Sequence, residues 1–561
     1  MSQTFAFKTK SAVAQITRDA TLPNNSIVKL EENSFNITGG TQTGNNLFHS
    51  FGEFSVPNGG TAFFNNVLDI QNIISRVTGG SVSNIDGIIR TNGAANLFLI
   101  NPSGIVFGAN ARLDVGGSFV ASTANALQFG NLGFFSATDK NIPSPLLTIN
   151  PSALLFNQIN QNAAIQNYSV APTGTDPAGL NALGLRVINS KSLLLVGGKV
   201  SMDGGRLNAF GGRVELGGLT EPGTLTLGVD GDNLSLRFPD NVTRSEVSLT
   251  NQAGVFVTGA GGGNIAVNAR NLEILGGSIL SGGIGLGLGT PETVAGDITL
   301  NATGEIKVAG TESIVRNIVR LGSLGNGGNI TIDSGSFSLQ DSAQLQTLTY
   351  GQGSAGNVTV RALDSVDLAG DARIFSTVEA GGVGKGGNID INAATLSLDV
   401  AALLTATRGA SATQPAGRGD AGNVNIKVTG SVDIAREKNG LPSGIFSSVQ
   451  TGTQGNGGNI TIDSGSFSLR DGTQLQALTR GQGNAGNVTV SAFDSVDLAG
   501  NASIISTVEA GGVGKGGNIN INAASLSLKD SAQLLTVTRA ASATQPAGQG
   551  DAGNVNVNVT G

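Results

Sequence analysis

The chain has 561 residues, of which 85 are glycine and 14 are proline, and only 13% of the residues are charged. A formal net charge of −7, with no run of Lys or Arg, excludes the basic surface that general binding to nucleic acid requires. The absence of cysteine excludes disulfides and thiol catalysis, and no apolar run approaches the ~20 residues of a membrane-spanning helix.

The first 25 residues resemble the remnant of an export leader. Lys8 and Lys10 fit a basic leader segment, and Ala12-Val13-Ala14 before Gln15 resembles a small-residue cleavage site. No apolar segment lies between these two features. Either part of a true leader is missing or the resemblance is accidental, and we predict a leader remnant over residues 1–25.

Residues 26–165 form a predicted aromatic-rich module that caps the rest of the chain. Fifteen of the 23 phenylalanines lie before residue 160, which predicts a compact core of large side chains. The only histidine, His49, lies between Phe48 and Phe51. A single histidine in a chain without cysteine is a poor candidate for metal binding or acid–base catalysis, so we expect it to be packed or hydrogen-bonded.

One short motif in this module predicts a tight turn. The apolar strand Leu97–Ile100 is followed by Asn101, Pro102, Ser103, Gly104 and Ile105. Proline fixes its own φ near −65°, and glycine at the fourth position permits a left-handed backbone. The motif therefore predicts a turn directly after a buried strand.

Two further regions follow, a continuation over residues 166–260 and a repeat region over residues 261–561. The segment that begins at Gly327 recurs almost unchanged at Gly457, which gives a super-period of 130 residues. Within it a Gly-Asn step before Ile or Val recurs every 28 to 36 residues. The asparagines of these steps are Asn329, Asn357, Asn388, Asn423, Asn459, Asn487, Asn518 and Asn554.

Each repeat unit contains short strands with alternating apolar residues, such as Ile330 and Ile332 around Thr331. A unit of about 30 residues with strands this short buries no core alone, whereas stacking successive units as coils buries a continuous one. The predicted fold is therefore all-β, a right-handed parallel β-helix. The repeated asparagines are expected to form a ladder in which each side-chain amide bonds to the side-chain amide of the next coil. A β-propeller is the alternative, although its blades need about 40–50 residues.

Two patterns suggest ligand binding or catalysis, but neither meets the requirements of such a site. Gly-Gly-Val-Gly-Lys-Gly-Gly begins at Gly381 and Gly511, but Lys385 and Lys515 stand where a calcium-binding repeat needs Asp and are not followed by the Ser or Thr of a phosphate-binding loop. The carboxylate pairs Asp364 with Asp367, and Asp494 with Asp497, recur with the super-period. One catalytic centre is not usually duplicated in this way, so we predict no catalytic, cofactor-binding or metal-binding residues.

Residues 26–130 resemble the N-terminal secretion domain of the filamentous haemagglutinin family, the exoproteins of two-partner secretion, and most closely its cyanobacterial variant. The resemblance rests on Gly-Asn-Asn-Leu-Phe-His-Ser-Phe-Gly-Glu-Phe from Gly44 and on Asn-Pro-Ser-Gly-Ile from Asn101. The family usually has Asn where this chain has Ser103. The resemblance implies a secretion domain over residues 26–165.

The resemblance further implies export through the periplasm and recognition by a dedicated outer-membrane β-barrel transporter. The implied recognition motif is residues 101–105 together with Asn45 and Asn46, while a turn that only shapes a coil explains residues 101–105 equally well. The implied product is a secreted or cell-surface rod, not an enzyme, that presents an adhesive surface to cell-surface carbohydrate or protein. Two alternatives remain: a carrier of a toxin beyond Gly561, and a polysaccharide lyase or hydrolase on a β-helix.

Overall fold

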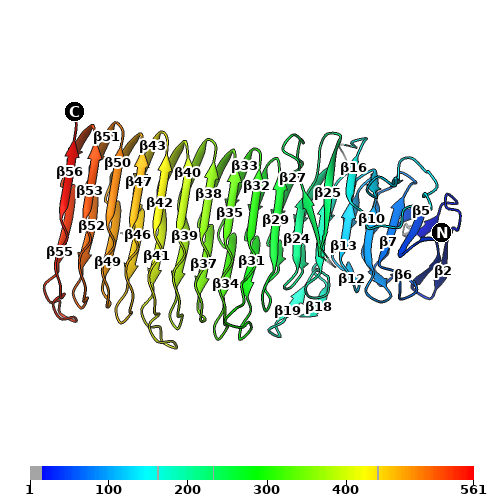
Figure 1. The fold of residues 1–561 in the computed structure, drawn as a ribbon, viewed down its shortest axis with the longest axis horizontal. Coiled ribbons are helices and arrows are strands. Elements are labelled where there is room, and N and C mark those ends of the chain that lie inside the picture. The colour runs from blue at the N-terminus through cyan, green and yellow to red at the C-terminus, as the bar shows by residue number, and fades with distance from the viewer. Residues whose placement is uncertain (1–15, 161–162, 231–232, 439–440) are drawn as a thin grey trace, which may run out of the picture.

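The computed structural model describes residues 16–160, 163–230, 233–438 and 441–561 and places them in one elongated stack of coils (Figure 1). The N-terminal module lies at one end and β56 (Val555–Val559) at the other. Every regular element among these residues is a strand, and none of them forms a helix that is long and apolar enough to span a membrane. The basic and small-residue signals at residues 8–15 lie outside the described residues.

Each coil of the repeat region contributes one strand to each of three faces. The first-face strands after the module are β24 (Arg213–Gly217), β29 (Asn264–Ala269), β32 (Ile298–Ala302), β35 (Ile330–Ser334), β38 (Val358–Ala362), β40 (Ile389–Ala393), β42 (Val424–Val428), β47 (Ile460–Ser464), β50 (Val488–Ala492), β53 (Ile519–Ala523) and β56. The second-face strands include β22 (Lys199–Asp203), β27 (Glu246–Thr250), β30 (Leu272–Leu275), β33 (Glu305–Ala309) and β36 (Ser336–Gln340). The third-face strands include β23 (Arg206–Asn208), β28 (Gly254–Phe256), β31 (Ile279–Ile284), β34 (Ile314–Val319) and β37 (Gln344–Thr349).

Successive coils pair in parallel and in register on all three faces. On the first face Ile298 lies beside Ile330, which lies beside Val358. The second and third faces continue through β39 (Ser365–Val378) and β41 (Thr395–Thr407), which each run across both faces. This arrangement confirms the predicted parallel β-helix.

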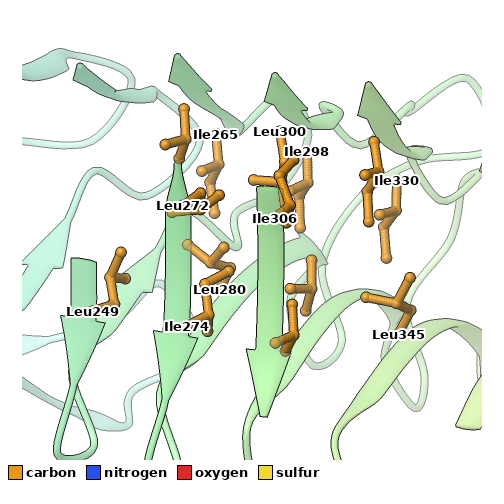
Figure 2. Close-up of a cluster of buried hydrophobic side chains, with 14 of the residues drawn as sticks. Leu249, Ile265, Leu272, Ile274, Leu280, Ile298, Leu300, Ile306, Ile330 and Leu345 are labelled. Atoms are coloured by element: carbon orange, nitrogen blue, oxygen red, sulfur yellow. The ribbon is translucent and has the colours of Figure 1, made fainter. Parts of the chain in front are cut away.

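Alternation along each strand fills a single continuous core. Ile330 and Ile332 are buried, while Thr331 between them is half-buried on the outer side. Aliphatic side chains from the three faces meet inside the coil and stack on those of the next coil (Figure 2). Burial of each such side chain contributes about 1.5–3 kcal/mol, so the stack is held by many equal layers rather than by one centre.

The Gly-Asn steps align as the predicted ladder. The side-chain oxygen of Asn388 accepts a hydrogen bond from the backbone N–H of Asn423 at 2.9 Å, and Asn423 accepts from Asn459 at 2.8 Å. The same bond links every step from Asn329 to Asn554. The main acceptor–donor pair is thus side-chain oxygen to backbone N–H, rather than amide to amide as the sequence suggested.

The glycine before each ladder asparagine is required by the close approach of the coils. A Cβ atom on Gly422 would lie 1.8 Å from the carbonyl oxygen of Gly387, and one on Gly458 would lie 1.9 Å from that of Gly422. Both contacts are with backbone, which cannot move aside without breaking the coil pairing. Steric exclusion and the ladder together explain why Gly-Asn recurs as a unit.

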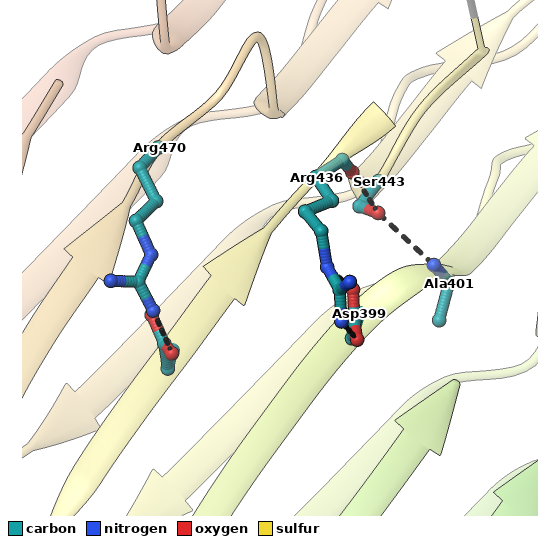
Figure 3. Close-up of polar contacts among 6 residues, drawn as sticks. Asp399, Ala401, Arg436, Ser443 and Arg470 are labelled. Carbon is teal, nitrogen blue, oxygen red and sulfur yellow. Dashed lines mark hydrogen bonds and ion pairs between the residues drawn. The ribbon is translucent and has the colours of Figure 1, made fainter. Parts of the chain in front are cut away.

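Charged side chains also pair between coils at the outer surface. Arg436 pairs with Asp399, and Arg470 pairs with Asp433 (Figure 3). The backbone N–H of Ala401 donates to Ser443 Oγ at 3.1 Å in the same region. Exposed pairs of this kind are worth at most about 1 kcal/mol each, so the core and the ladder carry the stability.

The N-terminal coils, up to and including residues 192–196, differ because their first-face strands are buried on both sides. These strands are β5 (Asn46–Phe54), β7 (Asn72–Val77), β10 (Asn96–Ile100), β13 (Phe119–Ser122) and β21 (Ser192–Val196). An antiparallel sheet covers their outer side and adds a second apolar core. Its strands are β14 (Ala126–Gln128), β15 (Phe134–Ser136), β16 (Ala153–Phe156), β25 (Gly223–Asp230) and β26 (Asn233–Arg237).

The open end of the stack is closed by short antiparallel strands, as expected of a capping module. β1 (Ile16–Arg18) pairs with the later part of β5, and β4 (Thr41–Thr43) pairs with its first part. Together they cover the edge of β5 that faces away from β7, which removes a free template for strand pairing. Residues 16–25, predicted as part of a leader remnant, belong to this folded cap in the structure.

Candidate functional site

The motif Asn101 to Ile105 forms the predicted turn at the end of β10. The backbone N–H of Gly104 donates to the carbonyl of Asn101 at 3.0 Å, and the N–H of Ser103 donates to Asn101 Oδ1 at 2.9 Å. Gly104 has φ of +116°, so the left-handed backbone expected of this glycine is present. Ile105 is fully buried and begins β11 (Ile105–Phe107).

Asn101 is a buried structural residue rather than part of the surface. Its side chain is 0% exposed and donates to the carbonyl of Ser81 and to Ser83 Oγ, both at 2.9 Å. Only Pro102 and Ser103 of the motif are partly exposed. A partner that reads this motif directly would therefore contact these two residues.

The other predicted pair also contains one exposed and one buried residue, since Asn45 is exposed and Asn46 is buried. Asn46 donates to the carbonyls of Leu147 and Ile149 at 2.9 and 2.7 Å. These bonds connect the first coil to the segment between β15 and β16 of the covering sheet. It also begins an internal amide ladder, because Asn72 donates to Asn46 Oδ1 at 2.8 Å.

The internal ladder continues from Asn72 to Asn96, which donates to Asn72 Oδ1 at 3.1 Å. Asn46 and Asn96 therefore occupy the same level at the start of their strands, whereas Asn101 follows the end of β10. The structure does not bring the two predicted groups together; it places them at opposite ends of the first face, about 17 Å apart along a five-residue strand.

Arg76 in β7 is the main polar centre of the module, and it was not among the residues predicted from the sequence. Its side chain is 0% exposed and donates to Ser50 Oγ at 2.8 Å, to the carbonyl of Ser136 at 2.6 Å and to Thr21 Oγ1 at 2.9 Å. Its guanidinium also lies 4.2 Å from the ring centre of Phe135. Arg76 thus joins the first face, the cap and the covering sheet. The available signal was a lone arginine in a short strand with the apolar residues Ile73, Ile74 and Val77.

Asp19 provides the countercharge to Arg76. Burial raises the pKa of Asp19, but hydrogen bonds from Thr21, Thr78 and Ser50 outweigh it and hold that pKa below its ordinary value. Burial lowers the pKa of Arg76 to about 10, opposed by the charge of Asp19, so Arg76 stays charged at neutral pH. The contacts of Arg76 and Asp19 therefore stabilise the fold and are not arranged for proton transfer.

His49 is packed and hydrogen-bonded, as expected. It is 1% exposed, its Nδ1 lies 3.0 Å from Ser26 Oγ, and its ring stacks on Phe51 with centres 6.0 Å apart. Burial lowers the pKa of His49 to about 3. The folded chain therefore holds a neutral imidazole at pH values where the unfolded chain binds a proton.

We expect this histidine to make the module acid-sensitive. The pKa of His49 in the folded chain lies below its unfolded value of 6.5. The contribution of the neutral imidazole to the free energy of unfolding is therefore fully present above pH 6.5. This free energy declines by up to about 5 kcal/mol as the pH falls toward 3. In a ¹³C-histidine-labelled chain the single resonance should stay unprotonated from neutral pH to about pH 4. His49→Asn should remove the part of the acid sensitivity that begins near pH 6.5. A titration midpoint near 6.5 in the folded chain would contradict the prediction.

One carboxylate of each pair considered for catalysis has a local hydrogen-bond partner. Asp367 Oδ2 accepts a hydrogen bond from Ser365 Oγ at 2.7 Å, and Asp497 accepts from Ser495 at 2.8 Å in the equivalent coil. Within the described ranges no three His, Cys, Asp or Glu side chains gather in a way that could hold a metal ion. Nothing in these contacts distinguishes the pairs from ordinary surface carboxylates.

The model of the TPS secretion domain family matches residues 14–267, which span the cap, the doubly buried first face and the covering sheet. Residues 14–267 are a TPS secretion domain. The resemblance to two-partner secretion exoproteins is thereby confirmed, and this TPS secretion domain includes both the predicted module and the predicted continuation. Among solved structures, the HMW1 secretion domain from Haemophilus influenzae is 16% identical, with a TM-score of 0.39, and the match covers 93% of this chain and 98% of that chain. No curated protein matches the chain.

Proposed function

We propose that this chain is recognised by a cognate outer-membrane transporter through its TPS secretion domain and is released outside the cell as a rod with an adhesive surface. The observation that carries the proposal is the family match over residues 14–267, which marks the chain as a substrate of two-partner secretion. The rod would then present its outer faces to carbohydrate or protein on a cell surface.

The fold suits passage of an extended chain followed by folding on the far side. Each coil pairs only with the coils before and after it, so a newly emerged coil can dock on the previous one. The cap comes first along the chain and covers one edge of β5, so it can serve as the template for the stack. The covering sheet needs residues up to Arg237 and is completed only after several coils have formed.

Secretion of the full chain tests the proposal. The chain, supplied with a periplasmic signal, is expressed with and without the cognate transporter, and the culture medium is assayed for the intact protein. We expect the protein in the medium only when the transporter is present. Intact protein that stays in the periplasm of both strains would overturn the secretion proposal.

The turn at residues 101–105 can be tested separately for direct recognition. Ser103→Arg adds bulk and charge at a partly exposed position without touching the core, and we expect it to reduce transporter-dependent secretion by about tenfold or more. The matched control is Ala412→Arg, an exposed position in the repeat region. Asn101→Ala should instead weaken the fold, because Ser81 and Ser83 lose a buried partner. Normal secretion of Ser103→Arg would leave the motif as a turn only.

A further inference from the structure

A cavity of about 210 Å³ lies on the outer side of the third face, beside a hairpin that leaves the coil. The hairpin consists of β18 (Pro172–Thr175) and β19 (Asn181–Leu183) and protrudes from the rod (Figure 1). Residues of the hairpin, the outer side of four successive third-face strands and the segment after β31 line the cavity. It therefore spans the TPS secretion domain and the first coils beyond it.

The strand register explains which side chains reach this cavity. Leu207, Val255, Leu280 and Val315 lie side by side and fill the core. The residues that follow them along each strand alternate to the outer side and form a second row. That row consists of Asn208, Phe256, Ser281 and Arg316, all of which line the cavity.

Three arginines, Arg206, Arg316 and Arg320, line the cavity, and none of them pairs with a carboxylate of the described residues. The Nε atom of Arg206 is buried without a hydrogen-bond partner. Arg316 Nε donates to Ser281 Oγ at 3.1 Å. Burial lowers the pKa of Arg316, and the neighbouring charge of Arg320 lowers it further, so these two guanidinium groups lie close enough to repel each other.

The one carboxylate in the lining, Asp176, is engaged in the hairpin. Its Oδ1 accepts hydrogen bonds from the backbone N–H groups of Ala178 and Leu180 at 2.9 and 2.8 Å. The charge of Asp176 also raises the pKa of Arg186, against the lowering by burial. Arg186 lies outside the cavity lining and donates to the hairpin carbonyls of Thr173 and Thr175. Positive charge is therefore in excess at the cavity, in a chain whose net charge is −7.

The remaining lining is largely apolar and restricts the size of a ligand. Phe256, Leu286 and Leu288 contribute apolar surface beside the arginines. A volume of about 210 Å³ is smaller than the roughly 300–1,000 Å³ of pockets for drug-sized molecules, so it suits a body of about one ring. The planar fork of a guanidinium matches a carboxylate through two parallel hydrogen bonds.

We propose that this cavity binds a small carboxylate on a ring-sized body, the chemistry that an acidic sugar unit presents. Arg316 and Arg320 bind the carboxylate, and the ring lies against Phe256 and the leucines. The super-period places Phe446 and Gln450 at the positions that correspond to Arg316 and Arg320, so the rod carries this arginine pair once and does not repeat it. The inference goes beyond the proposed secretion and adhesion and does not depend on either.

Calorimetric titration of the purified full chain tests the site, with D-glucuronate as the probe and D-glucose and inorganic phosphate as comparison ligands. We expect saturable binding of glucuronate, no binding of glucose, and phosphate binding at least about tenfold weaker because the apolar lining gives it nothing to contact. Arg316→Gln and Arg320→Gln should each raise the Kd for glucuronate by about tenfold or more. The matched control is Arg361→Gln, whose side chain pairs with Asp333 on the first face.

Three results would overturn the proposal: no saturable binding of glucuronate, an unchanged Kd in the folded arginine variants, or phosphate binding as tight as glucuronate. Hydrogen exchange of β34 shows whether each variant is folded. If Arg316→Gln, which also loses the hydrogen bond to Ser281, does not fold, Arg320→Gln alone tests the site. Because binding is measured on purified protein, failure here leaves the secretion proposal untouched, and failure of secretion leaves this one untouched.

Discussion

Replacing Arg76 with Met should destabilise the N-terminal module by about 3–5 kcal/mol. Methionine has a similar length but donates no hydrogen bond, so the carbonyl of Ser136 and the Asp19 carboxylate lose their buried partner. The chain has no cysteine, so Ala62→Cys, at a position that is 0% exposed, reports opening of the module through thiol labelling. We expect labelling at least about a hundredfold faster when Arg76 is replaced.

The matched control for this change is Arg90→Met in the same module. Arg90 pairs with Asp114 through side chains that are 49% and 60% exposed, so its loss should cost less than about 1 kcal/mol. A buried reporter in the repeat region, Ala406→Cys, should be unaffected by either variant, because coils contact only their neighbours. Equal labelling rates for the Arg76 and Arg90 variants would show that the buried network does not hold the module together.

Replacing Gly422 with Ala should disrupt the stack locally and cost more than about 3 kcal/mol. The added Cβ would lie 1.8 Å from the carbonyl oxygen of Gly387, so the two coils must separate and the ladder bond between Asn388 and Asn423 must break. The same Ala406→Cys reporter, which lies in the coil just before Gly422, should then label much faster than in the parent chain.

A second glycine separates steric clash from backbone freedom. Gly287 has φ of +67°, and a Cβ atom added there would meet nothing within 4 Å, so Gly287→Ala should cost only the left-handed backbone, about 1–2 kcal/mol. Gly422 has no such φ, and its cost comes from the neighbouring coil alone. If Gly422→Ala is no worse than Gly287→Ala, close coil approach is not what requires the glycine of the Gly-Asn step.

The repeat region was predictable because every rule that specifies it is local and recurs. Alternating residues such as Ile330 and Ile332 identify the strands, and the Gly-Asn steps fix where each coil returns to the same level. The turn at Asn101 was also predictable, since the residues that form it are adjacent in sequence. Only the type of ladder bond differed, because a side-chain oxygen serves a backbone N–H as readily as another amide.

The covering sheet and the sites beneath it were not predictable, because they join segments far apart in the chain. β16 pairs with β25 about seventy residues later, and no periodic pattern connects them. One signal was nevertheless present: runs such as Leu97–Ile100, in which every residue is apolar, indicate a strand that is buried on both faces. The arginine cavity depends on a hairpin that interrupts the coil, and its place on the third face follows only from the three-dimensional register.

The super-period has a geometric consequence for the length of the molecule. From Asn329 to Asn459 the ladder advances by four coils, and neighbouring strands lie about 4.8 Å apart, so each 130-residue copy extends the rod by about 19 Å. Duplication of a whole copy would return every outer side chain to the same face and leave the core unchanged. The length of the rod can therefore change in steps of one copy, while the TPS secretion domain at residues 14–267 stays unchanged.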